Sequence, residues 1–464
     1  MIPGFSSVLV IGLGRSGRAS TGVLRKSGAR VWATDEAPPE NLVEARDELR
    51  ARGAEYVAPD ALASILADVE AAVISPGVPL NSALVRGVQN AQVPVFSEIE
   101  LAYRICKAPI VALTGTKGKT TTTALVGHLF RTAGRSTLVG GNIGNPLIDE
   151  AARAEPGQWV IAEVSSFQLE SIRSFKPKVS AIINISPDHL DRYFSMEHYA
   201  EAKLRIFANQ NVGDTFVGNL DDERLAPLSE GEGAERLKAR AFWFSREPHR
   251  YSTLYLRGGK KIVYAPPAGD PRPIDVMDVA EIPLRGAHNV DNVMAAALMA
   301  LAAGVELEPI RRAVRSFEPL PHRLTEVATL DGVTYVDDSK ATNPGAVLAG
   351  LRTFEEGKIV LIAGGKAKGT DFSELGKAVS SRTRGVVLIG ESADALAEVI
   401  KRSKVARADS MQGAVEAAAG LAQRGDVVLL SPGCASFDMF ASAEARGDAF
   451  AAAVRRLEAT EAVH

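Results

Sequence analysis

The sequence predicts an α/β protein of three domains, each built on a mostly parallel β-sheet. Short apolar runs that end in Gly-rich or polar loops recur along the chain, each followed by a helical pattern, and this alternation is typical of βαβ units. A chain of 464 residues is long enough for about three domains with separate cores. The strand pattern restarts near residues 103–109 and again after 318–323. We therefore expect domains at residues 1–105, 106–319 and 320–464.

The composition excludes several classes of function. With 46% hydrophobic and 23% charged residues and a net charge of −3, the chain offers no basic surface for nucleic acid or for an anionic membrane. Cys106 and Cys434 are the two cysteines, too few for a disulfide framework or a zinc cluster. No apolar run approaches the length of a membrane span, and the N-terminus has no basic signal region. We expect a cytoplasmic protein with neither a membrane span nor a nucleic-acid partner.

The first domain begins with a diphosphate-binding pattern. A buried-type strand at 8–11 runs into GLGRSG, where Gly12, Gly14 and Gly17 form GxGxxG, and a second strand ends at Asp35. This arrangement predicts a Rossmann-like domain, and its turn can hold a dinucleotide or a nucleotide sugar. A strand at 71–74 then ends in Ser75, Pro76 and Gly77, at the sheet edge where α/β proteins bind ligands. A simple Pro-Gly turn is the alternative for this loop.

The second domain opens with a phosphate-binding loop. The segment VALTGTKGKTTTT at 111–123 reads as a strand, a Gly-rich loop and a helix. Loop N–H groups and the helix dipole favour phosphate, Lys119 adds a positive charge, and the Thr120 hydroxyl can ligate Mg²⁺. The strict GxxxxGK[ST] spacing is not met, because Leu113 stands where the first Gly falls. The pattern still predicts a nucleoside triphosphate site in a P-loop ATPase-like parallel sheet domain.

Polar residues follow the next strands of this domain. Asn142 lies in the turn-rich GGNIGNP, and Glu163 interrupts an apolar strand, where a carboxylate is costly unless it is paired or metal-bound. His189 follows a buried strand and lies between two acids in DHLD, which favours a functional role; a structural histidine is the alternative. Lys203 lies in the helical segment HYAEAKLRIF and is expected, from the local sequence alone, to face solvent.

Residues 229–285 lose clean periodicity, and we expect surface loops around short strands there. An Ala/Leu-rich helix follows GAHNVDN, with Asn289 and Asn292 on one face at i,i+3; helix capping by Asn289 is the alternative. The segment EPLPHR at 318–323 resembles a hinge.

The third domain repeats the α/β pattern in VTYVDDSKATNP, KIVLIAGGKAKGTDF, GVVLIG and DVVLLSPGCASFDMF. Parallel strands that end in polar loops assemble one site at their carboxyl edge. Lys340, Lys366 and Lys368 concentrate there, which predicts a site for an anion; a solvated basic surface is the alternative.

Taken in order, TGTKGKT, GGNIG, NISPDHLDR, AKLRIF, GAHNxxN, LPHR and DDSKATNP resemble the Mur ligases, the three-domain ATP-dependent amide-forming enzymes of peptidoglycan precursor synthesis. DDSKATNP and SPGCASFDMF are most similar to the members that add D-glutamate. The resemblance implies a monomer that joins D-glutamate to UDP-N-acetylmuramoyl-L-alanine through an acyl phosphate, using ATP and two Mg²⁺. Another Mur ligase or a folylpolyglutamate synthetase is the runner-up. Outside the family, an NAD-dependent dehydrogenase or a nucleotide-binding switch or transport ATPase would leave several of these motifs unused.

The resemblance also implies a site for each ligand. The UDP substrate is expected at Gly14, Arg15, Ser16, Asp35, Ser75, Pro76, Gly77 and Asn142. ATP is expected at Gly115, Thr116, Lys117, Gly118, Lys119, Thr120, Thr121, Asn289, Asn292, Arg323 and Asp338. The amino acid is expected at Lys340, Thr342, Lys368 and Ser436. One Mg²⁺ would be held by Thr120 and Glu163, and the second by His189 and a CO₂-derived carbamate on Lys203. The expected catalytic residues are Lys119, Asn142, His189 and Lys203.

Two positions depart from the family pattern. Lys117 stands where the family loop commonly has Asn, and Ala443 stands where related enzymes often have an aromatic residue against the glutamate.

Overall fold

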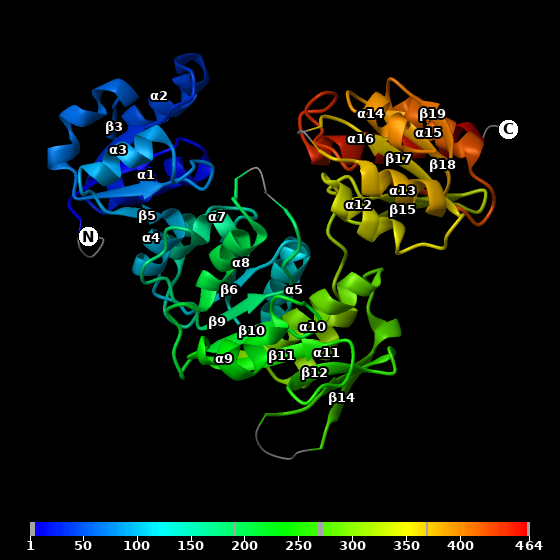
Figure 1. Cartoon of the computed structure of the whole chain (residues 1–464), viewed down its shortest axis with the longest axis horizontal. Coiled ribbons are helices and arrows are strands. Elements are labelled where there is room, and N and C mark those ends of the chain that lie inside the picture. Colours follow the sequence, from blue (N-terminus) through cyan, green and yellow to red (C-terminus); the bar gives the residue numbers. More distant parts are fainter. Residues whose placement is uncertain (1–4, 189–191, 268–271, 368–369, 402, 462–464) are drawn as a thin grey trace. The chain divides into compact units, whose positions relative to one another are not determined.

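The computed structural model describes residues 5–188, 192–267, 272–367, 370–401 and 403–461. It confirms the α/β class: three separate sheets follow one another along the chain (Figure 1). The chain divides into two compact units, Met1–Ile282 with Asp291–Phe317, and Pro283–Val290 with Glu318–His464. The first unit holds two sheets and the second unit holds one. The predicted boundary between residues 105 and 106 stays a prediction.

The first sheet is parallel, with the strand order β3-β2-β1-β4-β5. Its strands are β1 (Ser7–Ile11), β2 (Arg30–Thr34), β3 (Glu55–Tyr56), β4 (Ala71–Ile74) and β5 (Val95–Ser97). Its helices are α1 (Arg15–Lys26), α2 (Val43–Ala51), α3 (Ala83–Asn90) and α4 (Glu98–Ile105). The strand order reverses between β1 and β4, so a ligand crevice is expected at the carboxyl ends of those strands.

The second sheet has the order β14-β13-β12-β11-β10-β9-β6-β8-β7. Its parallel part comprises β6 (Ile110–Thr114), β7 (Thr137–Gly141), β8 (Trp159–Glu163), β9 (Val179–Ile182), β10 (Thr215–Asn219), β11 (Arg240–Ser245) and β12 (Ser252–Arg257). The strands β13 (Lys261–Tyr264) and β14 (Ile274–Asp278) add an antiparallel edge. The accompanying helices are α5 (Lys119–Thr132), α6 (Leu147–Arg153), α7 (Ser166–Leu169), α8 (Met196–Leu204), α9 (Gly231–Glu235), α10 (Ala287–Ala302) and α11 (Leu307–Arg315).

The expectation of surface loops at 229–285 is only partly right, because β11 to β14 extend the central sheet. Trp243, Phe244, Leu254 and Ile262 of these strands are buried. The pairing register shifts at Trp243/Phe244 and again at Ile262/Val263. A bulge displaces the alternation of inward and outward residues by one, so the strand period was hidden in the sequence.

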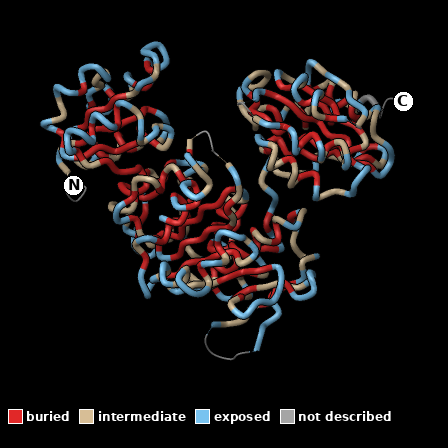
Figure 2. Tube along the Cα trace, viewed as in Figure 1, coloured by how far each residue is buried: buried red, intermediate tan, exposed pale blue. Residues whose placement is uncertain are grey.

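The third sheet has the order β15-β16-β20-β17-β18-β19, antiparallel between β15 and β16 and parallel elsewhere. Its strands are β15 (Thr325–Leu330), β16 (Val333–Asp337), β17 (Ile359–Gly364), β18 (Thr383–Ile389), β19 (Lys404–Arg407) and β20 (Val427–Leu430). Its helices are α12 (Pro344–Leu351), α13 (Ser373–Arg382), α14 (Ala393–Val399), α15 (Met411–Leu421) and α16 (Ala443–Glu461). All residues of β17 are buried, because helices cover both faces of the sheet there. Figure 2 shows such buried segments in red, whereas the edge strand β19 is mostly exposed.

Helix α4 carries two buried carboxylates that the sequence analysis did not single out. The Glu98 side chain is fully buried and accepts the Ile148 N–H of α6 at 2.6 Å. Glu100 accepts the backbone N–H groups of 173–175 at 2.8–2.9 Å. Buried carboxylates are stable when they collect such donors. Helix α4 is therefore fixed to helix α6 and to the segment 173–175, both of which accompany the second sheet.

Candidate active site

The phosphate loop lies between β6 and α5, as the sequence predicted. Gly118 caps α5 with φ 79°, and a Cβ there would lie 2.3 Å from the Asn292 Oδ1 of α10. A Cβ on Gly115 would lie 2.4 Å from the Ile183 Cγ1. Only glycine fits at both positions, because real Cβ contacts are longer. The loop backbone is therefore closely packed by its neighbours before any ligand binds.

The side chain of Asn184, just after β9, forms hydrogen bonds with the backbone of this loop. Its Oδ1 accepts the N–H groups of Thr116 at 3.1 Å and Lys117 at 2.9 Å, and its Nδ2 donates to the Lys117 carbonyl at 3.0 Å. Sequence reasoning missed Asn184; the available signal was a polar residue at the end of a buried strand. The departure at Lys117 thus lies at a position whose backbone is fixed on both sides.

Two lysines meet at this loop. The Nζ of Lys119 donates to the carbonyls of Gly115 at 2.9 Å and Thr116 at 3.0 Å. The Nζ of Lys203 donates to the same Gly115 carbonyl at 2.9 Å and lies 4.5 Å from the Tyr199 ring centroid. Burial, and then the charge of Lys119, hold the pKa of Lys203 well below its usual value.

The expectation that Lys203 faces solvent is wrong, since its relative exposure is 1%. Its neighbours Tyr199, Ala200, Ala202 and Leu204 are buried as well. Glu197, His198 and Glu201 form the exposed face of α8, whereas Lys203 lies on its buried face. The short helical pattern did not reveal which face is buried.

Glu163 and Asn142 form a pair at the carboxyl ends of β8 and β7. Glu163 is 2% exposed, and its Oε1 accepts the Asn142 Nδ2 at 2.9 Å. Its Oε2 is buried and has no hydrogen-bond partner among the described residues. Such an oxygen is costly unless a ligand or a cation completes it.

This carboxylate fits Mg²⁺, which prefers oxygen ligands. In the described part of the chain, no three His, Cys, Asp or Glu side chains gather as a metal-binding group. Mg²⁺ sites beside phosphates commonly use one or two carboxylates and take their other ligands from the phosphates and water. The predicted ligand His189 lies outside the described residues.

A cavity of about 520 Å³ lies at the carboxyl ends of β1, β2 and β4. Its lining includes every residue predicted for the UDP substrate, and additionally Gly12, Val78, Gly141, Gly144, Pro146 and Gln168. The Asp35 carboxylate accepts the N–H groups of Leu13 at 2.6 Å and Ala37 at 2.8 Å. Ser75 Oγ donates to the Gly12 carbonyl at 2.8 Å. The structure thus brings these residues together, while their assignment to UDP stays a prediction.

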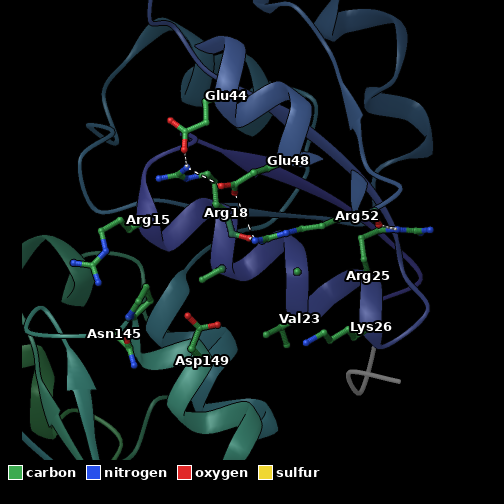
Figure 3. Close-up of a pocket in the computed structure, with 13 residues that line it drawn as sticks. Arg15, Arg18, Val23, Arg25, Lys26, Glu44, Glu48, Arg52, Asn145 and Asp149 are labelled. Atoms are coloured by element: carbon green, nitrogen blue, oxygen red, sulfur yellow. Dashed lines mark hydrogen bonds and ion pairs between the residues drawn. The ribbon is translucent and has the colours of Figure 1, made fainter. Parts of the chain in front are cut away.

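A second groove, of about 730 Å³, adjoins this cavity along α1 and α2 and shares Arg15 and Pro146 with it (Figure 3). It is rich in arginine, yet Arg18 lies 3.1 Å from Glu48 and 3.6 Å from Glu44. These pairs neutralise much of its positive charge, so we assign no anion to it.

The second unit contains several of the residues predicted for ATP. Asp338 follows β16, is buried, and accepts the Ser431 Oγ at 2.8 Å. Burial raises the pKa of Asp338 to about 7, and the charge of Arg323 opposes that rise. Asn289 also belongs to this unit, and its Nδ2 donates to the Arg285 carbonyl at 2.6 Å.

The residues predicted for the amino acid follow β16, β17 and β20. Lys340 pairs with Glu444 at 2.5 Å, Thr342 is exposed, and Ser436 is buried. Lys366 is exposed, and Lys368 lies outside the described residues.

Arg446 of α16 was missed by the sequence analysis. Its guanidinium is buried and donates to Ser339 Oγ at 3.0 Å, to the Ser339 carbonyl at 2.9 Å and to the Cys434 carbonyl at 3.1 Å. It therefore joins the loop after β16 to the loop after β20.

Comparisons with known proteins agree with this architecture. Residues 113–300 match the Mur ligase middle domain, and residues 322–434 match the Mur ligase, glutamate ligase domain. The chain is 44% identical over 446 residues to the UDP-N-acetylmuramoylalanine--D-glutamate ligase of Pelotomaculum thermopropionicum, covering 96% of each chain. It is 44% identical over 457 residues to the enzyme of that name from Salinibacter ruber, covering 97% of each.

Solved structures share the fold at low sequence identity. A pseudomurein peptide ligase type C from Methanothermus fervidus superposes with a TM-score of 0.60 at 17% identity, covering 97% of this chain and 100% of that one. A UDP-N-acetylmuramate-alanine ligase from Thermotoga maritima gives 0.58 at 20% identity, covering 98% and 99%.

The three sheets and the phosphate loop, together with these matches, define an ATP-dependent ligase that forms amide bonds. The chain belongs to the Mur ligase family. Within the described residues, no helix has the length and apolar character to cross a membrane.

Proposed function

We propose that this protein adds D-glutamate to UDP-N-acetylmuramoyl-L-alanine at the expense of ATP, in the synthesis of peptidoglycan precursors. The relatives that match over nearly the whole chain carry the name of this activity. The observation that carries the proposal is the cavity of about 520 Å³, whose lining gathers all the residues expected for the UDP substrate. It acts, on this proposal, as a cytoplasmic monomer.

The reaction brings together two anionic groups, the substrate carboxylate and the γ-phosphate of ATP. The substrate carboxylate attacks the γ-phosphate of ATP, which gives an acyl phosphate and ADP, and the amine of D-glutamate then displaces phosphate. Catalysis of this kind depends mainly on positioning and charge stabilisation. The first-turn N–H groups of α5 have no acceptor within the helix, so they can receive phosphate oxygens. Lys119 supplies the positive charge beside them, and movement of its Nζ from the loop carbonyls to phosphate leaves its three donors satisfied.

Mg²⁺, when bound, neutralises phosphate charge and polarises the transferred phosphoryl group. Thr120 and Glu163 would hold one ion, and the buried Oε2 of Glu163, which has no hydrogen-bond partner among the described residues, supports that role. Asn142 fixes the other oxygen of this carboxylate and also lines the cavity. It therefore lies where the sugar-nucleotide and phosphate sites adjoin.

The second ion would be held by His189 and by a carbamate on Lys203. A lysine ammonium has no acceptor and repels a cation, whereas a carbamate offers oxygen ligands. The neutral Nζ adds to the carbon of CO₂: an N–C bond forms, a C–O π bond opens, and the proton leaves to solvent. Burial of Lys203 beside the positive charge of Lys119 favours the neutral amine that this step needs.

The remaining assignments follow the same proposal. Asn289, Asn292, Arg323 and Asp338 would contact ATP, while Lys340, Thr342, Lys368 and Ser436 would orient D-glutamate. Asn289 and Asn292 lie on α10, Arg323 lies two residues before the start of β15, and the other residues follow strands of the third sheet.

The test uses the purified full chain with ATP, Mg²⁺ and UDP-N-acetylmuramoyl-L-alanine, and a panel of D-glutamate, L-glutamate, L-alanine and L-lysine. Of the four amino acids, we expect only D-glutamate to give phosphate release and a ligated product, which mass spectrometry detects. Lys119→Ala is the negative control: phosphate release is lost, while calorimetry gives an almost unchanged affinity for the UDP substrate. Product with another acceptor, such as UDP-N-acetylmuramate or a folate, and none with this pair would overturn the proposal.

A further inference from the structure

We propose that Arg192 is a positioning residue of the sugar-nucleotide site, because its guanidinium fixes the loop at Ser75–Gly77 that lines the cavity. This inference rests on the proposed function. Arg192 belongs to the segment after β9, whereas the loop follows β4 of the first sheet. The Nη1 of Arg192 donates to the Pro76 carbonyl at 3.0 Å, across 116 residues of sequence.

The loop at 75–79 has few backbone N–H groups, so its carbonyls depend on hydrogen-bond donors from outside the loop. Its sequence is SPGVP, so Pro76 and Pro79 have no N–H to give. Within the loop the Val78 N–H donates to the Ser75 carbonyl at 3.0 Å, and Ser75 Oγ donates to the Gly12 carbonyl. These bonds hold the start of the loop, while the Pro76 carbonyl is held by Arg192. A loop with few backbone donors is positioned by the side chain that reaches it.

The guanidinium itself is held on three sides. Its Nη2 lies 3.0 Å from Glu170 Oε2, and its Cζ lies 3.9 Å from the centroid of the Phe167 ring. The Arg192 and Glu170 side chains are only 17% and 14% exposed. The Phe167 ring stacks in turn on Tyr193 at 5.8 Å and 19°. A planar fork that is stacked and paired in this way has one orientation, and that orientation directs Nη1 to Pro76.

A second arginine makes the reciprocal contact. Arg15 of α1, in the first sheet's domain, donates from Nη2 to the Gly144 carbonyl beyond β7 at 2.7 Å. Pro76 and Gly144 both line the cavity of about 520 Å³. Two arginine-to-carbonyl bonds, one in each direction, therefore link the two groups of loops that form the cavity. Loss of the hydrogen bond from Arg192 to Pro76 should make the loop at 75–77 more mobile and leave the phosphate loop unchanged.

The chain offers a matched control in Arg205. It lines the same cavity of about 430 Å³ as Arg192, and it donates to the carbonyls of Leu169 at 2.8 Å and Ile172 at 2.7 Å. Both acceptors belong to the second sheet's domain, so Arg205 does not reach the loop at 75–77. An Arg→Lys change removes the planar fork and keeps the charge at either position.

The experiment compares Arg192→Lys and Arg205→Lys with the unmodified full chain in steady-state assays. We expect Arg192→Lys to raise the KM for UDP-N-acetylmuramoyl-L-alanine about 10-fold, the scale of one lost charge-assisted hydrogen bond. The KM values for ATP and D-glutamate should stay within about 2-fold, since those ligands have other contacts. Arg205→Lys should lower the melting temperature and leave the sugar-nucleotide KM unchanged.

Several outcomes would overturn the inference. If folded Arg192→Lys keeps its KM for the UDP substrate, Arg192 contributes to local packing alone. The same conclusion follows if Arg205→Lys raises that KM as much as Arg192→Lys does. Where melting shows that Arg192→Lys does not fold, Glu170→Gln replaces it: the guanidinium stays but loses its anchor, and an unchanged KM there refutes the proposal. Absence of activity in the unmodified chain with this substrate pair would instead refute the proposed function.

Discussion

Lys119 and Lys203 place their Nζ atoms on one backbone carbonyl, that of Gly115, each at 2.9 Å. Two ammonium groups on one oxygen repel each other, and Lys203 is the buried member of the pair. The fold therefore favours loss of the proton from Lys203, in agreement with its strongly lowered pKa. A neutral amine beside a phosphate loop is the reactive form toward CO₂.

We predict that Lys203→Arg lowers the turnover number by about 100-fold or more, as loss of a metal ligand does, because a guanidinium stays charged and forms no carbamate at neutral pH. The direct readout is ¹³C NMR after equilibration with labelled bicarbonate. A carbamate resonance is expected in the unmodified chain and not in Lys203→Arg. Lys203→Ala should recover part of its activity with added formate. Full activity in folded Lys203→Arg, or no labelled resonance, would contradict the carbamate.

Gly118→Ala should abolish ATP turnover, because the new Cβ would lie 2.3 Å from Asn292 Oδ1 in a loop already at φ 79°. Gly134→Ala is the control: its φ is 75°, and no atom of the residues that the structure describes lies within 4 Å of the added Cβ. The control should cost about 1 kcal/mol of stability from backbone strain alone and keep its KM for ATP. If both variants retain ATP affinity by calorimetry, close packing at Gly118 does not define the phosphate loop.

Glu98 should make stability fall as pH rises. Burial raises its pKa from 4.5 to about 7, opposed by the hydrogen bond from the Ile148 N–H. Between those values the folded chain holds a proton that the unfolded chain has lost. The stability supplied by protonated Glu98 is therefore complete below pH 4.5 and lost by about pH 7. The difference in unfolding free energy between the unmodified chain and Glu98→Gln should shrink by about 3 kcal/mol over this range. Urea unfolding at several pH values measures it, and a constant difference would rule out a buried, titrating Glu98.

Local sequence patterns predict residues that gather at one edge of a sheet. Gly14, Asp35 and Ser75 were predicted because a Gly-rich turn and strand-end loops gather at one edge of a parallel sheet. Their neighbour Asn142 was predicted from the family resemblance, and the cavity contains all four.

The missed residues depend on partners distant in sequence. Arg192 reaches Pro76 across 116 residues, and Arg446 reaches Ser339 across 107. No spacing rule encodes such pairs. Glu98 did leave a local signal, since SEIELA places two acids in an apolar stretch, and a buried acid needs donors that only the fold supplies.

Arg446→Lys should weaken the binding of D-glutamate specifically. The Arg446 guanidinium donates to both Ser339 and Cys434. Ser339 directly precedes Lys340, and Cys434 lies two residues before Ser436; Lys340 and Ser436 are both predicted to bind the amino acid. Burial lowers the pKa of Arg446 to about 10, so the group stays charged at neutral pH. A lysine ammonium is a single point of donors and cannot span both loops.

We therefore expect the KM for D-glutamate to rise about 10-fold in Arg446→Lys, with the KM for the UDP substrate unchanged, because its predicted site lies in the other unit. Arg384→Lys is the control. Arg384 pairs with Asp426 at 2.5 Å at the opposite, amino-terminal ends of β18 and β20, so its loss should lower the melting temperature alone. Because a buried lysine also destabilises the fold, Ser339→Ala provides a milder variant that removes one acceptor and should raise the same KM by a smaller factor. If both Arg446→Lys and Ser339→Ala fold and keep the KM for D-glutamate, the two loops do not need this arginine to form the amino-acid site.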